Sequence, residues 1–203
     1  PIVQSKEIAR RNIINDNKGD VSVVEMDTTV TATANGIKVV FNKKDGTIQS
    51  VKNANGLVSL NGGPVPVGVE TEVVETNWEN ILDGDFEFVV NYSQYPGQAV
   101  WKLHKNGLLE LEAQHISYKN GKIPNIDYIG ISFNYPEEKV EGITWMGQGP
   151  YRVWKNRTKG HNLGVWQKAY NNTITGESFN NLVYPEFKGY HGKLYWAKLE
   201  TTE

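Results

Sequence analysis

Apolar and polar residues alternate with a period of two along most of the chain from Val21 onward. Such alternation, rich in Val, Ile, Thr and aromatic residues, is typical of strands with one buried face. The pattern predicts strands over residues 21–23, 29–31, 37–41, 69–76, 86–92, 99–104, 108–117, 127–135, 142–146, 182–187 and 193–199. No long helical period follows Asn17, so the sequence predicts an all-β chain with little helix.

Glycine and asparagine mark the turns between these strands. Lys44-Asp45-Gly46 and Lys105-Asn106-Gly107 each join two β-rich segments, as in hairpins whose glycine takes a positive φ. Pro64 and Pro66 have no amide hydrogen, so they should interrupt a hydrogen-bonded ladder. Many short strands joined in this way favour an antiparallel sandwich or barrel over a parallel α/β sheet.

Residues 1–20 are polar and carry only a short apolar stripe. We expect them to form a linker or a strap from a preceding domain, and residues 21–203 to form one β domain. The chain starts without Met and stops just after a strand-like segment. Both ends are therefore expected to be cuts, with the domain truncated at its C-terminal end.

The chain's charge and composition exclude several classes of partner. The 203 residues carry a formal net charge of −2, which gives no electrostatic case for nucleic acid or a membrane surface as partner. No apolar run is long enough to span a bilayer, and no signal peptide is recognisable. The chain has no cysteine, so the redox compartment cannot be read from it. The compartment is unknown, with a bacterial periplasmic or extracellular location slightly favoured over a cytoplasmic one.

The segment over residues 144–166 is the most distinctive in the chain. It holds three tryptophans, four glycines and two arginines and is predicted to be one loop. Flat aromatic faces beside donor groups suit a polar, ring-like ligand or a protein interface. The residues predicted to bind carbohydrate or line a domain interface are Tyr151, Arg152, Trp154 and His161. Those predicted to form a structural motif are Trp145, Gly147, Gly149, Pro150 and Arg157.

Trp145-Met146-Gly147-Gln148-Gly149-Pro150, followed by Asn156-Arg157, resembles a signature of β-galactosidases of glycoside hydrolase family 2. In that family it lies in the C-terminal, galactose mutarotase-like β domain. Residues 41–48 and 189–196 resemble two further strands of the same domain, so the resemblance runs from about residue 21 onward. The chain departs from the common pattern with Arg152 and Val153 after the signature and Trp154 in place of Tyr, which leaves the sugar and the linkage open.

The resemblance implies an antiparallel supersandwich fold and a non-catalytic role. Both catalytic glutamates of the family lie in a barrel domain that this chain lacks, so the fragment should be inactive alone. Its parent would be a retaining β-galactosidase, and the chain would pack on the catalytic barrel and shape the pocket for a β-galactoside-like carbohydrate. The alternatives are a stand-alone carbohydrate-binding module, an epimerase-like enzyme of the same fold, and a structural spacer.

No catalytic residue, metal or cofactor is predicted. Alternating glutamates on a strand are usually a solvated face, and isolated histidines in strands are usually structural. The glutamates and histidines weighed and set aside are Glu70, Glu72, Glu110, Glu112, His104, His115, His161 and His191. Asp83, Asp85 and Glu87 alternate along one edge, where calcium would be the candidate ion, but they do not make a persuasive metal site.

Overall fold

The computed structural model describes residues 19–82, 84–113, 129–150, 159–170 and 193–203. The chain divides into two compact units, Pro1–Tyr135 and Pro136–Glu203. The described residues are almost entirely strand, and each strand pairing is antiparallel, so the predicted all-β fold is confirmed. That residues 21–203 make one domain stays a prediction.

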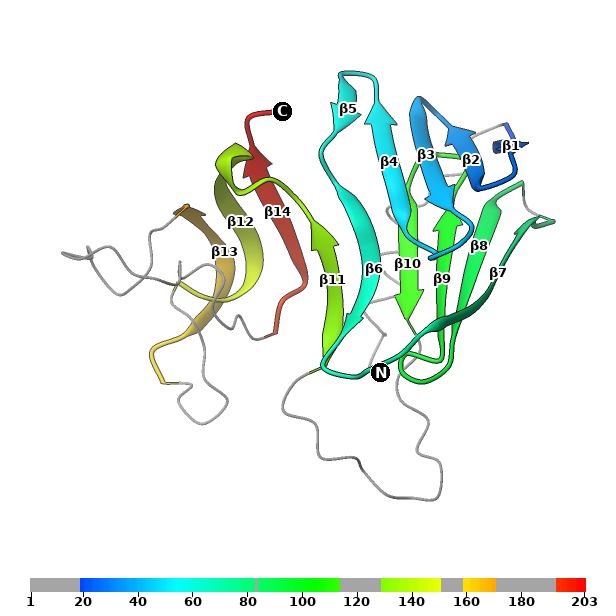
Figure 1. Ribbon diagram of the computed structural model, residues 1–203. Helices are drawn as coiled ribbons and strands as arrows, with labels where there is room; N and C mark the ends of the chain where they lie inside the picture. Colours follow the sequence, from blue (N-terminus) through cyan, green and yellow to red (C-terminus); the bar gives the residue numbers. More distant parts are fainter. Residues whose placement is uncertain (1–18, 83, 114–128, 151–158, 171–192) are drawn as a thin grey trace. The chain divides into compact units, whose positions relative to one another are not determined.

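The first sheet of unit 1 is a meander in which each strand pairs with the next along the chain (Figure 1). Its strands are β1 (Ser22–Glu25), β2 (Thr29–Ala34), β3 (Ile37–Asn42), β4 (Ile48–Asn53) and β5 (Gly56–Val58). The turn between β3 and β4 is built by Asp45, whose carboxylate accepts hydrogen bonds from the backbone and the hydroxyl of Thr47. Gly46 in this turn has a φ of 70°, as the sequence predicts.

A second sheet of unit 1 has the order β10-β9-β8-β7. Its strands are β7 (Val73–Asn80), β8 (Phe86–Tyr92), β9 (Gln98–Leu103) and β10 (Leu109–Ala113). The strand predicted over 86–92 has these bounds. The strand predicted over 69–76 has the wrong bounds. It starts at Val73, which leaves Glu70 and Glu72 in an exposed connection outside it.

The two sheets face each other across one apolar core. Phe41 of β3 stacks on Phe88 of β8 with ring centroids 4.8 Å apart, and it also contacts Phe86 and Trp101. Every second residue of β8, from Phe86 to Tyr92, is buried in this core. Unit 1 is therefore a β-sandwich, in agreement with the fold class predicted from the alternating pattern.

Strand β6 (Asn61–Val67) contains both prolines that should have interrupted it. It pairs with β11 (Gly130–Asn134) in a two-stranded sheet, with a shift in register between Ser132 and Asn134. The ladder is irregular over the residues that include Pro64, as predicted, whereas Pro66 is paired with Ile131 and does not interrupt it. A strand with one unpaired edge accommodates residues that have no N–H to donate.

Tyr92 closes the end of β8 with its hydroxyl in the core. Its Oη donates a hydrogen bond to the carbonyl oxygen of Pro64 at 3.2 Å, and burial, with a contribution from the charge of Asp45, raises the pKa of Tyr92 to about 12. Because this folded-state pKa lies above the ordinary value of about 10, the neutral phenol stabilises the fold below pH 10 and this contribution is lost between pH 10 and 12.

We expect Tyr92→Phe to cost about 1 kcal/mol of unfolding free energy at neutral pH, through loss of this hydrogen bond. Above pH 11 the order should reverse, because the wild type loses about 2 kcal/mol, after allowance for solvent screening, that the variant cannot lose. Urea denaturation of both proteins at pH 8 and at pH 11.5 measures this. A constant difference between them at the two pH values would contradict the burial of the phenol.

Unit 2 is a three-stranded antiparallel sheet of order β13-β12-β14, preceded by the short 3-10 helix η2 (Glu137–Lys139). Its strands are β12 (Val140–Gly149), β13 (Asn162–Ala169) and β14 (Trp196–Thr201). The strand predicted over 193–199 therefore begins later, at Trp196, and the one predicted over 182–187 lies outside the described residues. In the described part of the chain, no helix is long and apolar enough to cross a membrane.

Candidate functional site

The signature segment is strand, not loop, over much of its length. Trp145 to Gly149 form the second half of β12, and Asn162 to Trp166 form most of β13, which pairs with it. The prediction of one loop over 144–166 is therefore wrong. Gly147, Gly149 and Gly164 all lie in paired, extended backbone.

Gly149 and Gly164 make room for the indole of Trp166. A Cβ atom placed on Gly149 would lie 2.6 Å from Cδ1 and 2.7 Å from Nε1 of Trp166, closer than carbon atoms approach. A Cβ on Gly164 would lie 3.0 Å from the same ring. The indole Nε1–H donates a hydrogen bond to the carbonyl oxygen of Gly147 at 3.1 Å. Gly149 and Gly164, together with the carbonyl oxygen of Gly147, thus form a flat seat for one aromatic side chain.

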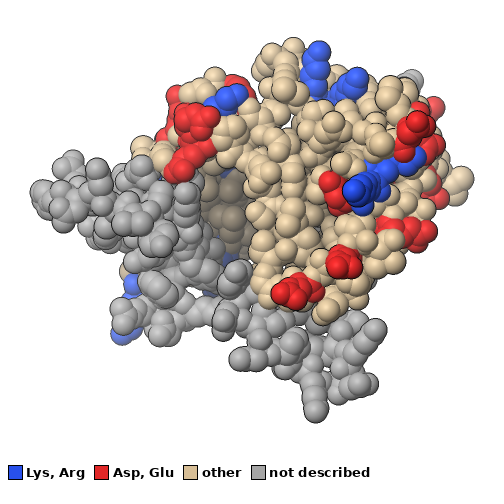
Figure 2. Space-filling view, viewed as in Figure 1, with Lys and Arg blue, Asp and Glu red and all other residues tan. Residues whose placement is uncertain are grey.

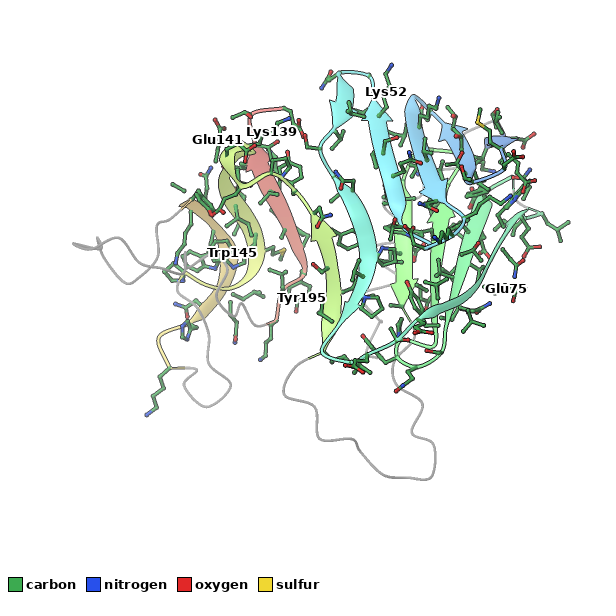
Figure 3. The ribbon with its side chains drawn as sticks, viewed as in Figure 1. Lys52, Glu75, Lys139, Glu141, Trp145 and Tyr195 are labelled. Carbon is green, nitrogen blue, oxygen red and sulfur yellow. The ribbon has the colours of Figure 1, made fainter. Side chains whose placement is uncertain are left out.

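Trp145 lies directly across the strand pair from Trp166 and is 1% exposed. Its indole Nε1–H donates to the carbonyl oxygen of Gln148 at 3.2 Å. Pro150 follows the end of β12 through a cis peptide bond and is half-buried. Figure 3 labels Trp145 on this strand. A buried indole whose N–H is hydrogen-bonded within its own strand is compatible with the structural role predicted for Trp145.

The predicted ligand-contacting residues are mostly outside the described part of the chain. Tyr151, Arg152 and Trp154 all fall there, as does Arg157 of the predicted structural motif. His161 is described and lies just before β13, with its side chain half-buried; among described residues, none accepts or donates a hydrogen bond at its Nδ1. The structure therefore places His161 beside the signature strands, and the role of the group stays a prediction.

The opposite side of the unit 2 sheet, which we call the exposed face, carries a separate group of side chains. Met146 lies between Val165 of β13 and Trp196 of β14, its direct cross-strand partners. Val165 is 60% and Trp196 45% exposed. Tyr195, which precedes β14 and is labelled in Figure 3, donates its backbone N–H to the carbonyl oxygen of Met146 at 2.9 Å.

Polar side chains occupy the neighbouring positions of the exposed face. Thr144 lies between Gln167 and Lys198, one step along each strand from the apolar row. The Glu200 carboxylate accepts hydrogen bonds from the Thr144 hydroxyl at 2.7 Å and from the Gln167 amide at 2.9 and 3.0 Å. The bonds from Thr144 and then Gln167 hold the pKa of Glu200 below its ordinary value, so its carboxylate is charged at neutral pH. The members of this group come from three strands, so no motif in the sequence indicates that they lie together.

The histidine predicted to be structural, His104, is bound by two carboxylates in unit 1. Its Nδ1 lies 2.7 Å from Oδ2 of Asp85 and its Nε2 lies 3.0 Å from Oε2 of Glu110. The other oxygen of Asp85 accepts a hydrogen bond from the backbone N–H of Lys105 at 2.8 Å. His104 is 5% exposed, so its ring is not available to a substrate. The trio joins the start of β8 to the hairpin between β9 and β10.

The residues weighed for calcium are engaged elsewhere. Asp85 binds His104, and the carboxylate of Glu87 lies 2.7 Å from the ammonium of Lys102. Asp83 lies outside the described residues. Across the ranges that the structure describes, no group of three His, Asp or Glu side chains is arranged to hold a metal ion. On the face of unit 1 shown in Figure 2, Lys and Arg side chains stand among Asp and Glu and do not gather in one basic patch.

A family model described as the β-galactosidase small chain matches residues 68–203. This match covers all strands from β7 to β14, well over half of the chain. The chain belongs to the β-galactosidase small-chain family. The predicted relation to β-galactosidases is thereby confirmed, and the glycine seat of Trp166 is a feature of this small-chain domain.

A curated relative of the small-chain domain is β-galactosidase BgaC of Bifidobacterium adolescentis. The two are 29% identical over 93 residues, a stretch that makes up 46% of this chain and 8% of BgaC. The chain thus matches a small part of the length of that relative.

Proposed function

We propose that the chain is a non-catalytic domain of a larger β-galactosidase, in which it packs on the catalytic part and shapes the rim of the sugar pocket. The observation that carries this proposal is the match of residues 68–203 to the β-galactosidase small chain. A small chain implies a larger partner, and the relative BgaC is far longer than the stretch that it shares with this chain. The partner would be a catalytic barrel, and the ligand of the assembled pocket a β-galactoside.

We further propose that the parent is a retaining enzyme of glycoside hydrolase family 2 and that this domain is its C-terminal, galactose mutarotase-like supersandwich. The W-x-G-x-G-P signature at residues 145–150 supports this assignment. The sandwich of unit 1 and the antiparallel sheet of unit 2 are compatible with such a fold.

The segment after the signature is the part proposed to face the catalytic domain. Tyr151, Arg152 and Trp154 follow β12. The indoles of Trp145 in β12 and of Trp166 in the paired strand β13 both donate hydrogen bonds to backbone carbonyl oxygens of β12, so the signature would fix where this segment leaves the sheet. His161 lies just before β13, the strand that pairs with β12.

Single alanine variants of Tyr151, Arg152 and Trp154, made in the β-galactosidase that contains this domain, test the proposal. Hydrolysis of o-nitrophenyl β-D-galactopyranoside should show a KM raised by about tenfold or more if the side chains line the pocket, because a lost contact of about 1.4 kcal/mol has that effect. If they seal the domain interface, kcat and thermal stability should fall together. Unchanged kinetics and stability in all three variants would refute the proposed role of the segment.

A further inference from the structure

The exposed face of unit 2 combines an apolar shelf with hydrogen-bonding side chains. The shelf is the cross-strand row Val165, Met146 and Trp196. The next row, about 7 Å away along the strands, is Gln167, Thr144 and Lys198. The indole of Trp196 thus stands at the edge of a polar row, on the same side of the sheet.

The polar row is held in place before any ligand arrives. The Glu200 carboxylate accepts hydrogen bonds from both Thr144 and Gln167, which fixes three side chains from three strands against one another. Because these groups sit on paired backbone, little conformational entropy would be lost when a ligand binds.

We propose that this face binds a carbohydrate, with the C–H side of a hexopyranoside ring stacked on Trp196 and its hydroxyl groups bound by Lys198, Gln167 and the Glu200 carboxylate. Sugars present one apolar side and a rim of hydroxyls, which matches an aromatic plane beside amide, ammonium and carboxylate groups. Such binding would be a property of unit 2 and is separate from packing on a catalytic barrel.

The side-chain composition of the face favours a sugar over a protein partner. Its polar members are Gln148, Gln167, Thr144, Lys198 and Glu200, and its other members are Gly142, Leu163, Val165, Ala169, Met146 and Trp196. The centre of a protein interface is depleted of charged residues, whereas here Lys198 and Glu200 adjoin the tryptophan and the threonine. A face with nearly half its positions able to form hydrogen bonds suits a polyhydroxylated ligand.

Isothermal titration calorimetry of the full 203-residue chain tests this proposal, with methyl β-D-galactopyranoside and lactose as probes. A shallow site with one aromatic should give a Kd on the order of 1 mM. Trp196→Ala should weaken binding at least tenfold and Gln167→Ala several-fold. The matched control is Leu199→Ala, which removes an exposed apolar side chain of β14 from the other side of the sheet, where Leu199 pairs with Ile143, and should leave Kd within twofold.

Three results would overturn the proposal. One is the absence of binding by either sugar up to about 50 mM in a chain whose thermal melt is normal. Another is binding that survives both Trp196→Ala and Gln167→Ala, which would place the sugar elsewhere on the chain. The third is that neither sugar binds while Leu163→Glu dissociates an oligomer in sedimentation, which would make the face a protein contact. The kinetics of the Tyr151, Arg152 and Trp154 variants do not depend on any of these outcomes.

Discussion

Replacement of His104 by leucine is expected to lower the unfolding free energy of unit 1 by about 2–4 kcal/mol. The imidazole is buried and contacts Asp85 at 2.7 Å and Glu110 at 3.0 Å. Leucine fills a similar volume but leaves two partly buried carboxylates without this partner. Because Asp85 also accepts a hydrogen bond from the Lys105 backbone, the hairpin between β9 and β10 should loosen with it.

Urea denaturation of His104→Leu, followed by far-UV circular dichroism at pH 7, measures this loss. The control is Lys52→Ala on the exposed side of β4 (Figure 3), where a surface substitution should change stability by less than about 0.5 kcal/mol. If His104→Leu were as stable as Lys52→Ala, the trio of Asp85, His104 and Glu110 would contribute nothing to the fold.

Replacement of Gly149 by alanine is expected to destabilise unit 2 by about 1–3 kcal/mol, because the new methyl group would overlap the indole of Trp166. The control is Gly130→Ala in β11, where the methyl group would meet only Val67 Cγ2 at 3.5 Å, an ordinary contact. Gly130→Ala should therefore cost little.

A double-mutant cycle identifies the cause of the Gly149→Ala effect. In a Trp166→Ala background the ring that collides with the new methyl group is gone, so the cost of Gly149→Ala should fall below about 0.5 kcal/mol. Near-UV circular dichroism during thermal unfolding reports the tryptophan environment directly. Additive costs of the two substitutions would show that the glycine is required for some reason other than the seat of Trp166.

The alternation of apolar residues was sufficient to predict an antiparallel sandwich or barrel, and the family resemblance favoured the sandwich. The buried positions of β8, Phe86, Phe88 and Val90, are the apolar positions of a period-two pattern in the sequence. The bounds of edge elements were less accurate: β7 is shifted because the residues around Glu70 and Glu72 also alternate, and alternation alone does not show which residues find a partner strand. Pro64 and Pro66 fit in β6 because this strand has one pairing partner among the described strands, and the sequence does not show how many partners a strand will have.

The candidate site was predicted only in part. The signature drew attention to β12, but the segment was predicted to be a loop, because a sequence does not show whether a glycine serves positive φ or the close approach of a ring. Gly149 serves close approach, to an indole from another strand. The carboxylate partners of His104 lie 6 and 19 positions from it, and the polar row around Glu200 joins residues up to 56 positions apart, so no single spacing rule connects them.

The central claim is that this chain is a non-catalytic part of a larger β-galactosidase, and complementation in trans tests it most directly. The chain and the remainder of its parent enzyme would be purified separately, and hydrolysis of o-nitrophenyl β-D-galactopyranoside measured for each alone and for the mixture. We predict no turnover by the chain alone, little by the remainder, and recovery of activity on mixing. Turnover by the chain alone, or full activity of the remainder without it, would contradict this account.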